Sequence, residues 1–425
     1  MTRKQAALSL MLLIGLSGAV GCGAQPAKPG IHVVQSADGW RMMVDGAPFM
    51  VNGMNWDHYP IGTNYEYVFW NQPDTLIRAV LDHEMGLLKA AGVNAIRVYT
   101  GIQPKWITHI YETYGIRTML NHSFGRYGLM LDGSWVANTD YADPRVEEIL
   151  IREVTQLVRD YEGTPGLLLY LLGNENNYGL FWEGAETQDI PMADRASTHR
   201  ARAMYKLFNK GAVAMKAVGV NRPIAIANGD DMFLDIIAEE VPDMDIFGTN
   251  TYRGLTFTDL YDNVKSGYGK PVLLTEFGAD AFNSKTGQED QACQARYVVD
   301  NWMDVYSHAA GMGRAENSIG GFTFQFSDGW WKTGQTVELD VHNTTASWMN
   351  GGYTCDYQTG KNNMNEEWFG VLAKGPTQAS GIPELTPRAA YRALIDIHRF
   401  DPYAPDASLE SLKRHFENIV LESTR

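Results

Sequence analysis

A chain of 425 residues with 44% apolar and 20% charged residues has the composition of a globular protein and the length of one elaborated barrel domain. This composition excludes collagen-like and disordered chains. The net charge of −15 argues against nucleic acid as a partner, because phosphate binding requires a basic surface, and it fits a neutral substrate.

The N-terminal residues have the pattern of a bacterial export signal followed by a linker. Basic residues precede an apolar run over residues 6–16, which is too short to span a membrane. Small residues then lead to Cys22, as in a lipobox. We expect residues 1–21 to be removed as a signal peptide, Cys22 to be lipidated and residues 22–30 to form a flexible tether. Plain secretion is the alternative.

The residue after Cys22 is Gly rather than Asp. In bacterial sorting patterns this favours the outer membrane, so the sequence predicts a lipid-anchored protein that faces the periplasm or the cell surface.

From residue 31 onward, strand-like and helix-like patterns alternate after a short predicted β hairpin over residues 31–52. Short apolar runs predict eight strands, over residues 49–55, 95–99, 117–122, 167–173, 223–227, 244–249, 271–277 and 320–326. Periodic apolar residues predict helices over residues 75–91, 144–161, 195–218, 256–267, 288–308 and 387–400, the last with Thr386 as N-cap and Pro387 as its first residue.

Buried strands that alternate with helices predict a parallel sheet, and eight such units predict a closed (β/α)8 TIM barrel. We therefore expect residues 31–425 to form a single catalytic domain. Its most unusual feature is a long insertion after the eighth strand, residues 327–386, at the rim where barrel active sites form.

The predicted fourth and seventh strands each end in a glutamate. Glu175 follows Leu171-Leu172-Gly173-Asn174, and Glu276 follows Leu273-Leu274-Thr275. These strands lie opposite each other in a ring of eight, so both side chains are expected to face each other across the rim. Retaining cleavage of a glycoside needs two carboxyl groups about 5–5.5 Å apart, one protonated and one ionised.

Arg97 ends the second predicted strand and is a plausible ion partner of Glu276. A neighbouring cation favours the ionised carboxylate and therefore the nucleophile. Glu175 follows a neutral amide, Asn174, and is then the acid/base. The structural alternative is a strand-end glutamate that bonds to a helix N-terminus. This alternative is reasonable for either residue alone, but it is a poor explanation for both residues together.

Several ordered motifs resemble the catalytic barrel of glycoside hydrolase family 2 and its clan of retaining enzymes with catalytic residues on strands four and seven. They are Val51-Asn52-Gly53-Met54-Asn55-Trp56, the segment 88–97 that ends in Ala95-Ile96-Arg97, Gly173-Asn174-Glu175, Asn250-Thr251-Tyr252, Thr275-Glu276-Phe277-Gly278 and Pro387-Arg388-Ala389-Ala390-Tyr391.

This resemblance implies Glu175 as acid/base, Glu276 as nucleophile and Asn174 as the contact to the sugar 2-hydroxyl. It also implies that Tyr252 and Arg97 hold the nucleophile. The chain departs from the family in three ways. Only about 25 residues of the expected mature chain precede the first barrel strand, so the accessory sandwich domains are not expected. The third strand ends in Asn121-His122-Ser123 instead of an acidic segment, and Gln325 stands about where clan members often have a Trp.

Other residues at the predicted rim are candidates for sugar binding, each with a structural alternative: bonding to loop backbone, capping of a helix, or packing within a lid. They are His122, Trp56, His58, Tyr59, Asn228, Asp230, Trp182, Trp330 and Trp331.

Cys293 and Cys355 are the cysteines that remain after Cys22. Cys293 is expected near the start of the seventh helix and Cys355 in the long insertion above the same rim. A disulfide would fasten the insertion there; two buried free thiols are the alternative.

The ten histidines include no His-x-His or His-Glu-x-x-His pattern, and no glycine-rich phosphate loop with Lys is present, so no metal or other cofactor is expected. The sequence favours a retaining glycoside hydrolase acting on an oligo- or polysaccharide. A transglycosidase with the same residues is one alternative, and a catalytically dead glycan-binding surface lipoprotein is another. The oligomeric state is left open.

Overall fold

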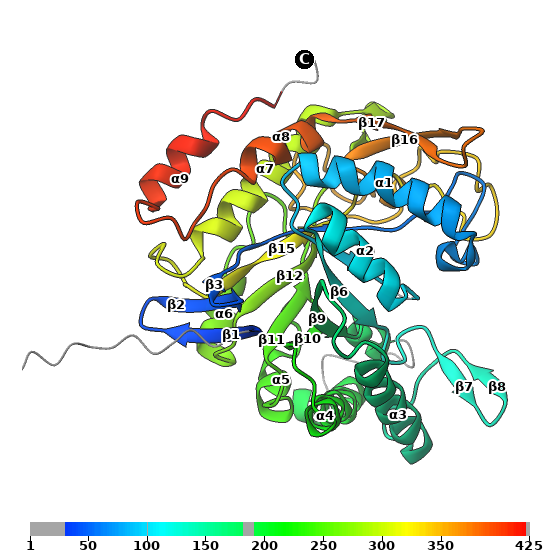
Figure 1. Ribbon diagram of the computed structural model, residues 1–425, viewed down its shortest axis with the longest axis vertical. Coiled ribbons are helices and arrows are strands. Elements are labelled where there is room, and N and C mark those ends of the chain that lie inside the picture. The colour runs from blue at the N-terminus through cyan, green and yellow to red at the C-terminus, as the bar shows by residue number, and fades with distance from the viewer. Residues whose placement is uncertain (1–29, 100, 182–190, 422–425) are drawn as a thin grey trace, which may run out of the picture.

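The computed structural model describes residues 30–99, 101–181 and 191–421. Parallel strands form a closed barrel at the centre of the molecule (Figure 1). In order around the barrel, the strands are β4 (Val51–Asn55), β5 (Ala95–Val98), β6 (Arg117–His122), β9 (Leu167–Leu172), β10 (Ile224–Gly229), β11 (Ile246–Asn250), β12 (Val272–Phe277) and β15 (Ser318–Thr323). The predicted (β/α)8 barrel is thereby confirmed, and β15 closes it by pairing with β4.

The continuous apolar strands follow from their burial on both faces. All six residues of β9, Leu-Leu-Leu-Tyr-Leu-Leu, are buried, because one face lines the barrel interior and the other packs under helices. Asn55, Asn250 and Glu276 lie at or near the ends of their strands, at the rim, which is why strand ends mark the site.

The helices form an outer layer around the barrel (Figure 1). They are α1 (Asp74–Ala90), α2 (Pro104–Tyr114), α3 (Pro144–Asp160), α4 (Ala196–Ala217), α5 (Leu234–Glu240), α6 (Leu260–Gly267), α7 (Gln291–Ser307), α8 (Ala389–Ile397) and α9 (Leu409–Phe416), with 3-10 turns η1 (Phe69–Asn71), η2 (Asn176–Phe181), η3 (Met192–Asp194) and η4 (Glu366–Trp368). The sequence had not predicted α2, α5 and α9, which are short. No helix among the described residues is both long and apolar enough to cross a membrane.

An antiparallel sheet of β1 (Ile31–Ser36), β2 (Gly39–Val44) and β3 (Ala47–Pro48) precedes the barrel, as the hairpin pattern predicted. Its buried residues Ile31, Met42 and Val44 share a core cluster with interior residues of the barrel, including Val51 and Ile319. The hairpin therefore covers one end of the barrel and leaves the rim at the other strand ends open.

The loops at the rim carry short hairpins of their own: β7 (Leu129–Leu131) with β8 (Ser134–Val136), β13 (Phe282–Asn283) with β14 (Gln288–Glu289), and β16 (Leu372–Thr377) with β17 (Pro383–Pro387). The last pair corrects one prediction. Thr386 and Pro387 do not start a helix, because they pair with Ala373 and Leu372 in the β16–β17 ladder. Helix α8 begins at Ala389, with Arg388 as N-cap.

Candidate active site

Glu276 lies near the end of β12 and is the centre of the polar cluster at the rim. Its Oε1 accepts hydrogen bonds from Arg97 Nη1 at 2.8 Å and Tyr99 OH at 2.7 Å, and its Oε2 accepts one from Tyr252 OH at 3.1 Å. The residue is only 7% exposed. Three donors, one of them cationic, fix the orientation of this carboxylate and compensate its burial.

Arg97 is completely buried and connects the two halves of the site. Besides Glu276, its guanidinium donates to Asn121 Oδ1 at 2.7 Å, to Asn174 Oδ1 at 2.8 Å and to Asn250 Oδ1 at 3.3 Å. It also donates to the backbone carbonyl of Thr275 at 3.2 Å. A planar group with several donors suits this arrangement, in which the side-chain acceptors come from different barrel strands or strand ends.

Glu175 follows β9 in a strained backbone conformation, with φ of 57°. Its backbone N–H donates to the carbonyl of Ala227 at 2.9 Å, which ties this turn to β10. Gly173 is required two residues earlier, because a Cβ there would lie 2.7 Å from Asn176 Oδ1 and 2.9 Å from the ring of Phe208. The local chain therefore places the glutamate side chain over the rim.

From the described residues, the carboxyl group of Glu175 receives one hydrogen bond, from Asn250 Nδ2 to Oε1 at 3.1 Å. Although the residue is reached by solvent, protein surrounds its carboxyl group. Burial, and secondly the nearby charge of Glu276, raise the pKa of Glu175 from 4.5 to about 7. One glutamate of the pair is therefore strongly bonded by donors, whereas the other holds its proton near neutrality.

Asn250 joins these two glutamates in one network. Its Nδ2 also donates to Asn174 Oδ1 at 3.1 Å, and its Oδ1 accepts from Thr275 Oγ1 at 2.6 Å. Asn174 Nδ2 in turn donates to Tyr127 OH at 2.8 Å. Because an amide nitrogen carries two hydrogens, the described residues leave one N–H of Asn174 for a ligand.

Three of the residues that the sequence singled out lie in one network with the two glutamates: Arg97 and Tyr252 bond to Glu276, and Asn174 bonds to Arg97. Tyr99, Asn121, Asn250 and Tyr127 were not assigned roles beforehand. Strand alternation could have found Tyr99, because it lies two residues after Arg97 and so points to the same side of the sheet.

His122 is bonded away from the two glutamates. Its Nδ1 accepts a hydrogen bond from the Phe124 backbone N–H at 3.2 Å, and its Nε2 lies 3.4 Å from Glu153 Oε2 on α3. Asn121 points into the barrel toward Arg97, so the next residue of the strand points to the helix layer. His122 is held by loop backbone and a helix and not by the site.

Trp56 and His58 both bond to Glu84 of α1 and not to Glu175 or Glu276. Trp56 Nε1 donates to Glu84 Oε2 at 2.7 Å, and His58 Nδ1 lies 2.8 Å from Glu84 Oε1. Both line a cavity of about 100 Å³ that extends to Tyr99. Trp330 stacks on His342, with ring centres 4.6 Å apart, and so packs within the insertion.

Asn228 and Asp230 hold the loop after β10. Asn228 Oδ1 accepts from Tyr205 OH at 2.7 Å, and its Nδ2 donates to backbone carbonyls, including that of Met232 at 3.0 Å. Asp230 pairs with Arg253, whose Nη2 lies 2.6 Å from Asp230 Oδ1. These contacts use the side chains for loop structure. Trp182 and Cys22 lie outside the described residues.

Neither Asp57 nor Lys332 had been assigned a role of its own, although Lys332 adjoins the candidates Trp330 and Trp331. The Nζ of Lys332 lies over the rings of Phe324 and Trp331, at 5.2 and 4.9 Å from their centres, and Glu276 is among the charges that act on it. Asp57 lines the cavity next to Tyr99, and burial raises its pKa. Among the residues that the structure describes, no group of His, Cys, Asp or Glu is arranged to hold a metal ion.

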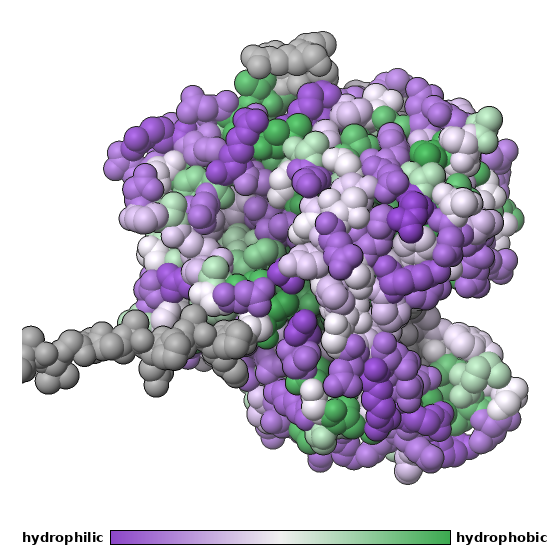
Figure 2. Space-filling model, in the orientation of Figure 1, coloured by the Kyte–Doolittle hydropathy of each residue, from purple (hydrophilic) through white to green (hydrophobic). Residues whose placement is uncertain are grey.

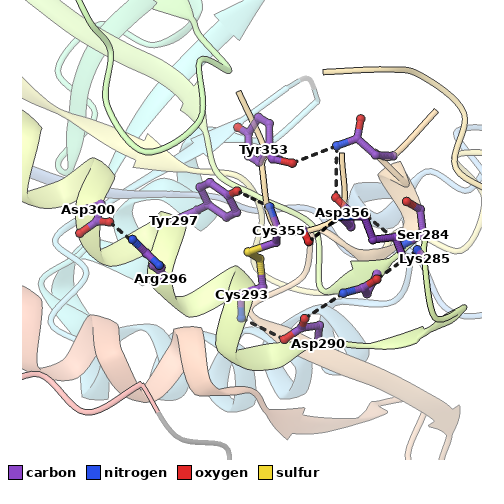
Figure 3. Close-up of a disulfide and its surroundings, with 12 residues drawn as sticks. Ser284, Lys285, Asp290, Cys293, Arg296, Tyr297, Asp300, Tyr353, Cys355 and Asp356 are labelled. Carbon is purple, nitrogen blue, oxygen red and sulfur yellow. Dashed lines mark hydrogen bonds and ion pairs between the residues drawn. A yellow bond between two sulfur atoms is a disulfide. The ribbon is translucent and has the colours of Figure 1, made fainter. Parts of the chain in front are cut away.

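Cys293 of α7 and Cys355 of the insertion form a disulfide, with Cα atoms 6.5 Å apart (Figure 3). Close to it, Tyr353 OH donates to the carbonyl of Gly278 at 2.6 Å. A few residues earlier, Asn350 Nδ2 donates to the carbonyl of Tyr252 at 2.8 Å. The disulfide therefore fastens a segment that supports one of the donors to Glu276.

Solved structures with a similar fold include three larger enzymes. They are a β-galacturonidase of family GH2 from Eisenbergiella tayi bound to galacturonate (14% identity, TM-score 0.52, 88% of this chain and 55% of that one), a β-glucuronidase from Bacteroides uniformis (13%, 0.55, 87% and 37%) and a β-D-glucuronidase from Dictyoglomus thermophilum (15%, 0.50, 89% and 54%). The chain thus spans about half or less of their lengths, and at these identities the likeness concerns the fold alone.

No curated protein matches the chain. A family model, described as glycosyl hydrolases family 2, TIM barrel domain, matches residues 40–337. The match spans most of the chain and includes both glutamates with Arg97, Asn174, Asn250 and Tyr252. The chain therefore belongs to glycosyl hydrolases family 2, through the TIM-barrel domain of that family.

Proposed function

We propose that this protein is a retaining glycosidase in which Glu276 is the nucleophile and Glu175 the acid/base. The observation that carries the proposal is the difference between the two carboxyl groups. Glu276 accepts three hydrogen bonds, whereas the pKa of Glu175 is raised to about 7 by burial and by the charge of Glu276. Such a difference separates the roles of two neighbouring carboxyl groups.

In the first step, an oxygen of Glu276 attacks the anomeric carbon and forms an ester bond to it. The bond to the leaving oxygen breaks, and the proton of Glu175 moves to that oxygen. In the second step, the Glu175 carboxylate takes a proton from water, whose oxygen attacks the same carbon. The ester bond breaks, and the electron pair returns to the Glu276 carboxylate.

The substrate is then a β-linked oligo- or polysaccharide. Asn174 supports this assignment with the N–H that its partners leave available, close to both carboxyl groups. The complete hydrogen-bond network argues against a dead glycan-binding protein, because a binder has no need of two carboxyl groups held in such unequal environments.

Incubation with a 2-deoxy-2-fluoro β-glycoside that carries a good leaving group tests the mechanism. Peptide mapping should find the sugar on Glu276, and labelling of another residue would overturn the assignment. Glu276→Ala should lose turnover but keep binding, with Glu153→Ala on α3 as a control outside the site. Full activity of the Glu276 variant would reject the mechanism.

Transfer of the sugar to another sugar uses the same residues and differs only in the acceptor of the second step. Product sizing after incubation with β-linked oligosaccharides separates the two reactions. Products no longer than the donor support hydrolysis, whereas longer products identify a transglycosidase.

We further propose that the protein is exported and anchored through lipid on Cys22, with residues 1–21 removed. A disulfide between Cys293 and Cys355 supports export, because such bonds persist in oxidising compartments. Metabolic labelling with radioactive palmitate should mark the wild type but not Cys22→Ala. Equal labelling of both proteins would contradict lipidation at this cysteine.

A further inference from the structure

An exposed aromatic surface begins beside the active site and extends along the β7–β8 hairpin. The hairpin projects from the body of the molecule in Figure 1, and Figure 2 shows apolar surface on the lobe that carries it, beside a notch. Met130 and Trp135 are cross-strand partners and are 55% and 60% exposed. Leu129 on the other face is buried. One face therefore fastens the hairpin, and the other presents large side chains to solvent.

Tyr127 joins this surface to the catalytic network. Its ring is 57% exposed, yet its hydroxyl accepts the hydrogen bond from Asn174 Nδ2. Arg126 Nε also donates to the backbone carbonyl of Asn174 at 2.9 Å. The residue next to Glu175 is thus held by the same segment that leads into the hairpin.

Trp135 lies against the backbone that follows Tyr127. A Cβ on Gly128 would lie 2.9 Å from Cζ2 of the Trp135 ring, and the φ of Gly128 is +96°. Only glycine allows this close approach. Tyr127, Met130 and Trp135 therefore form one continuous surface, which we call the hairpin strip.

We propose that the hairpin strip binds the leaving-group sugars of an extended glycan, which rests on the proposed glycosidase function. The strip follows β6, the neighbour of β9 in the barrel, whereas Glu276 lies across the barrel on β12. The leaving group departs on the side of the acid/base, away from the nucleophile. Sugar units beyond the broken bond therefore run over Tyr127 and Trp135.

The chemistry of the strip favours a glycan over a membrane. Aromatic rings pack against the C–H faces of sugars, and Tyr adds a polar group at the wet edge. The tip of the hairpin carries exposed Asp132, which pairs with Arg145, so the most protruding residues are polar and charged. A net charge of −15 also disfavours an anionic lipid surface.

Leaving-group length provides the test. The full-length enzyme and Trp135→Ala are compared on 4-nitrophenyl β-glycosides, whose leaving group is one small ring, and on β-linked hexasaccharides with the same terminal sugar. We expect kcat/KM for the hexasaccharide to fall about tenfold and that for the aryl glycoside to stay within about twofold. Trp135→Tyr should restore most of the loss, and Val213→Ala, an exposed residue on α4, should change neither value.

An equal loss on both substrates would show a general structural effect, and no loss on either would show that the strip does not bind sugar; both overturn the inference. Loss of binding to vesicles of phosphatidylethanolamine and phosphatidylglycerol, with unchanged hexasaccharide kinetics, would assign the strip to a membrane instead. The proposed glycosidase function fails separately, if the wild type cleaves none of the aryl glycosides or hexasaccharides, and the inference then fails with it.

Discussion

Glu175→Gln should stabilise the folded protein above neutral pH, although it removes the proposed acid/base. The pKa of Glu175 is about 7 in the folded protein and 4.5 in an exposed glutamate, with burial as the larger cause and the charge of Glu276 as the second. Between these two pH values, the folded protein holds a proton here that the unfolded chain has lost. The free energy of unfolding therefore decreases as pH rises through this range.

The size of the effect follows from the difference between the two pKa values, about 2.5 units, at 1.36 kcal/mol per unit, or about 3 kcal/mol in total. This loss is absent below pH 4.5 and complete above pH 7. A glutamine does not titrate, and its Oε1 still accepts the hydrogen bond from Asn250. The variant should therefore match the wild type at pH 4.5 and exceed it by about 3 kcal/mol at pH 8.

Urea unfolding at 25 °C, followed by tryptophan fluorescence at pH 4.5, 6, 7 and 8, measures this difference. Groups that do not interact with residue 175 titrate equally in both proteins and cancel. Glu148→Gln, at an exposed position on α3, is the matched control and should run parallel to the wild type. If the difference between Glu175→Gln and wild type is constant over this pH range, Glu175 is not a buried acid and the reasoning is refuted.

The raised pKa of Glu175 also predicts an alkaline limb in the pH dependence of kcat/KM. With a pKa of about 7, the protonated fraction falls about tenfold per pH unit above neutrality, and kcat/KM should fall with it. For an activated aryl glycoside, which needs no proton on its leaving group, Glu175→Gln should abolish this limb in the first step. A limb that persists in the variant would belong to another residue.

Three further variants test the remaining parts of the site. Arg97→Lys keeps the charge but cannot reach Glu276 and three amide oxygens together, so kcat should fall about 100-fold in a protein with unchanged circular dichroism, and near-wild-type kcat would contradict this role. Tyr99→Phe removes one hydrogen bond to a charged group, so kcat/KM should fall by about 10- to 100-fold, and a loss below twofold would assign Tyr99 to packing alone. The double variant Cys293→Ser, Cys355→Ser opens a loop of 62 residues and should lower the free energy of unfolding, measured in urea, by about 4 kcal/mol. The reduced wild-type protein should show the same loss. Equal stability of the oxidised and reduced wild type would refute the contribution of the disulfide.

The barrel and the meeting of Glu175 and Glu276 at its rim were predictable because they depend on simple sequence patterns. Runs such as Leu167–Leu172 are apolar throughout, and only a strand buried on both faces needs this. Glu175 and Glu276 were visible as the first charged residues after such runs. Arg97 was visible as a cation inside an apolar strand. A buried cation is costly without a partner, so its position predicts an anionic partner.

The surrounding residues depend on orientation and on loop geometry, which sequence patterns describe less well. His122 was chosen over Asn121 although the two point in opposite directions, and the bond from Arg97 to Asn121 decides which one faces the site. Thr386 and Pro387 fit a helix start locally. Their pairing with β16, about fourteen residues earlier in the chain, overrides that preference, and no local sequence pattern predicts this pairing.

The difference between the two glutamates originates in β5 rather than in the glutamates themselves. This strand supplies both Arg97 and, directly after it, Tyr99, and both donate to Oε1 of Glu276. Glu175 receives one amide N–H, and that amide also belongs to the network of Arg97. Because Arg97 and Tyr99 both donate to the carboxylate on β12, the proposed roles of the two glutamates cannot be exchanged by a change at positions 175 and 276 alone. Under the proposed mechanism, β5, which carries neither glutamate, therefore decides which of the two is the nucleophile.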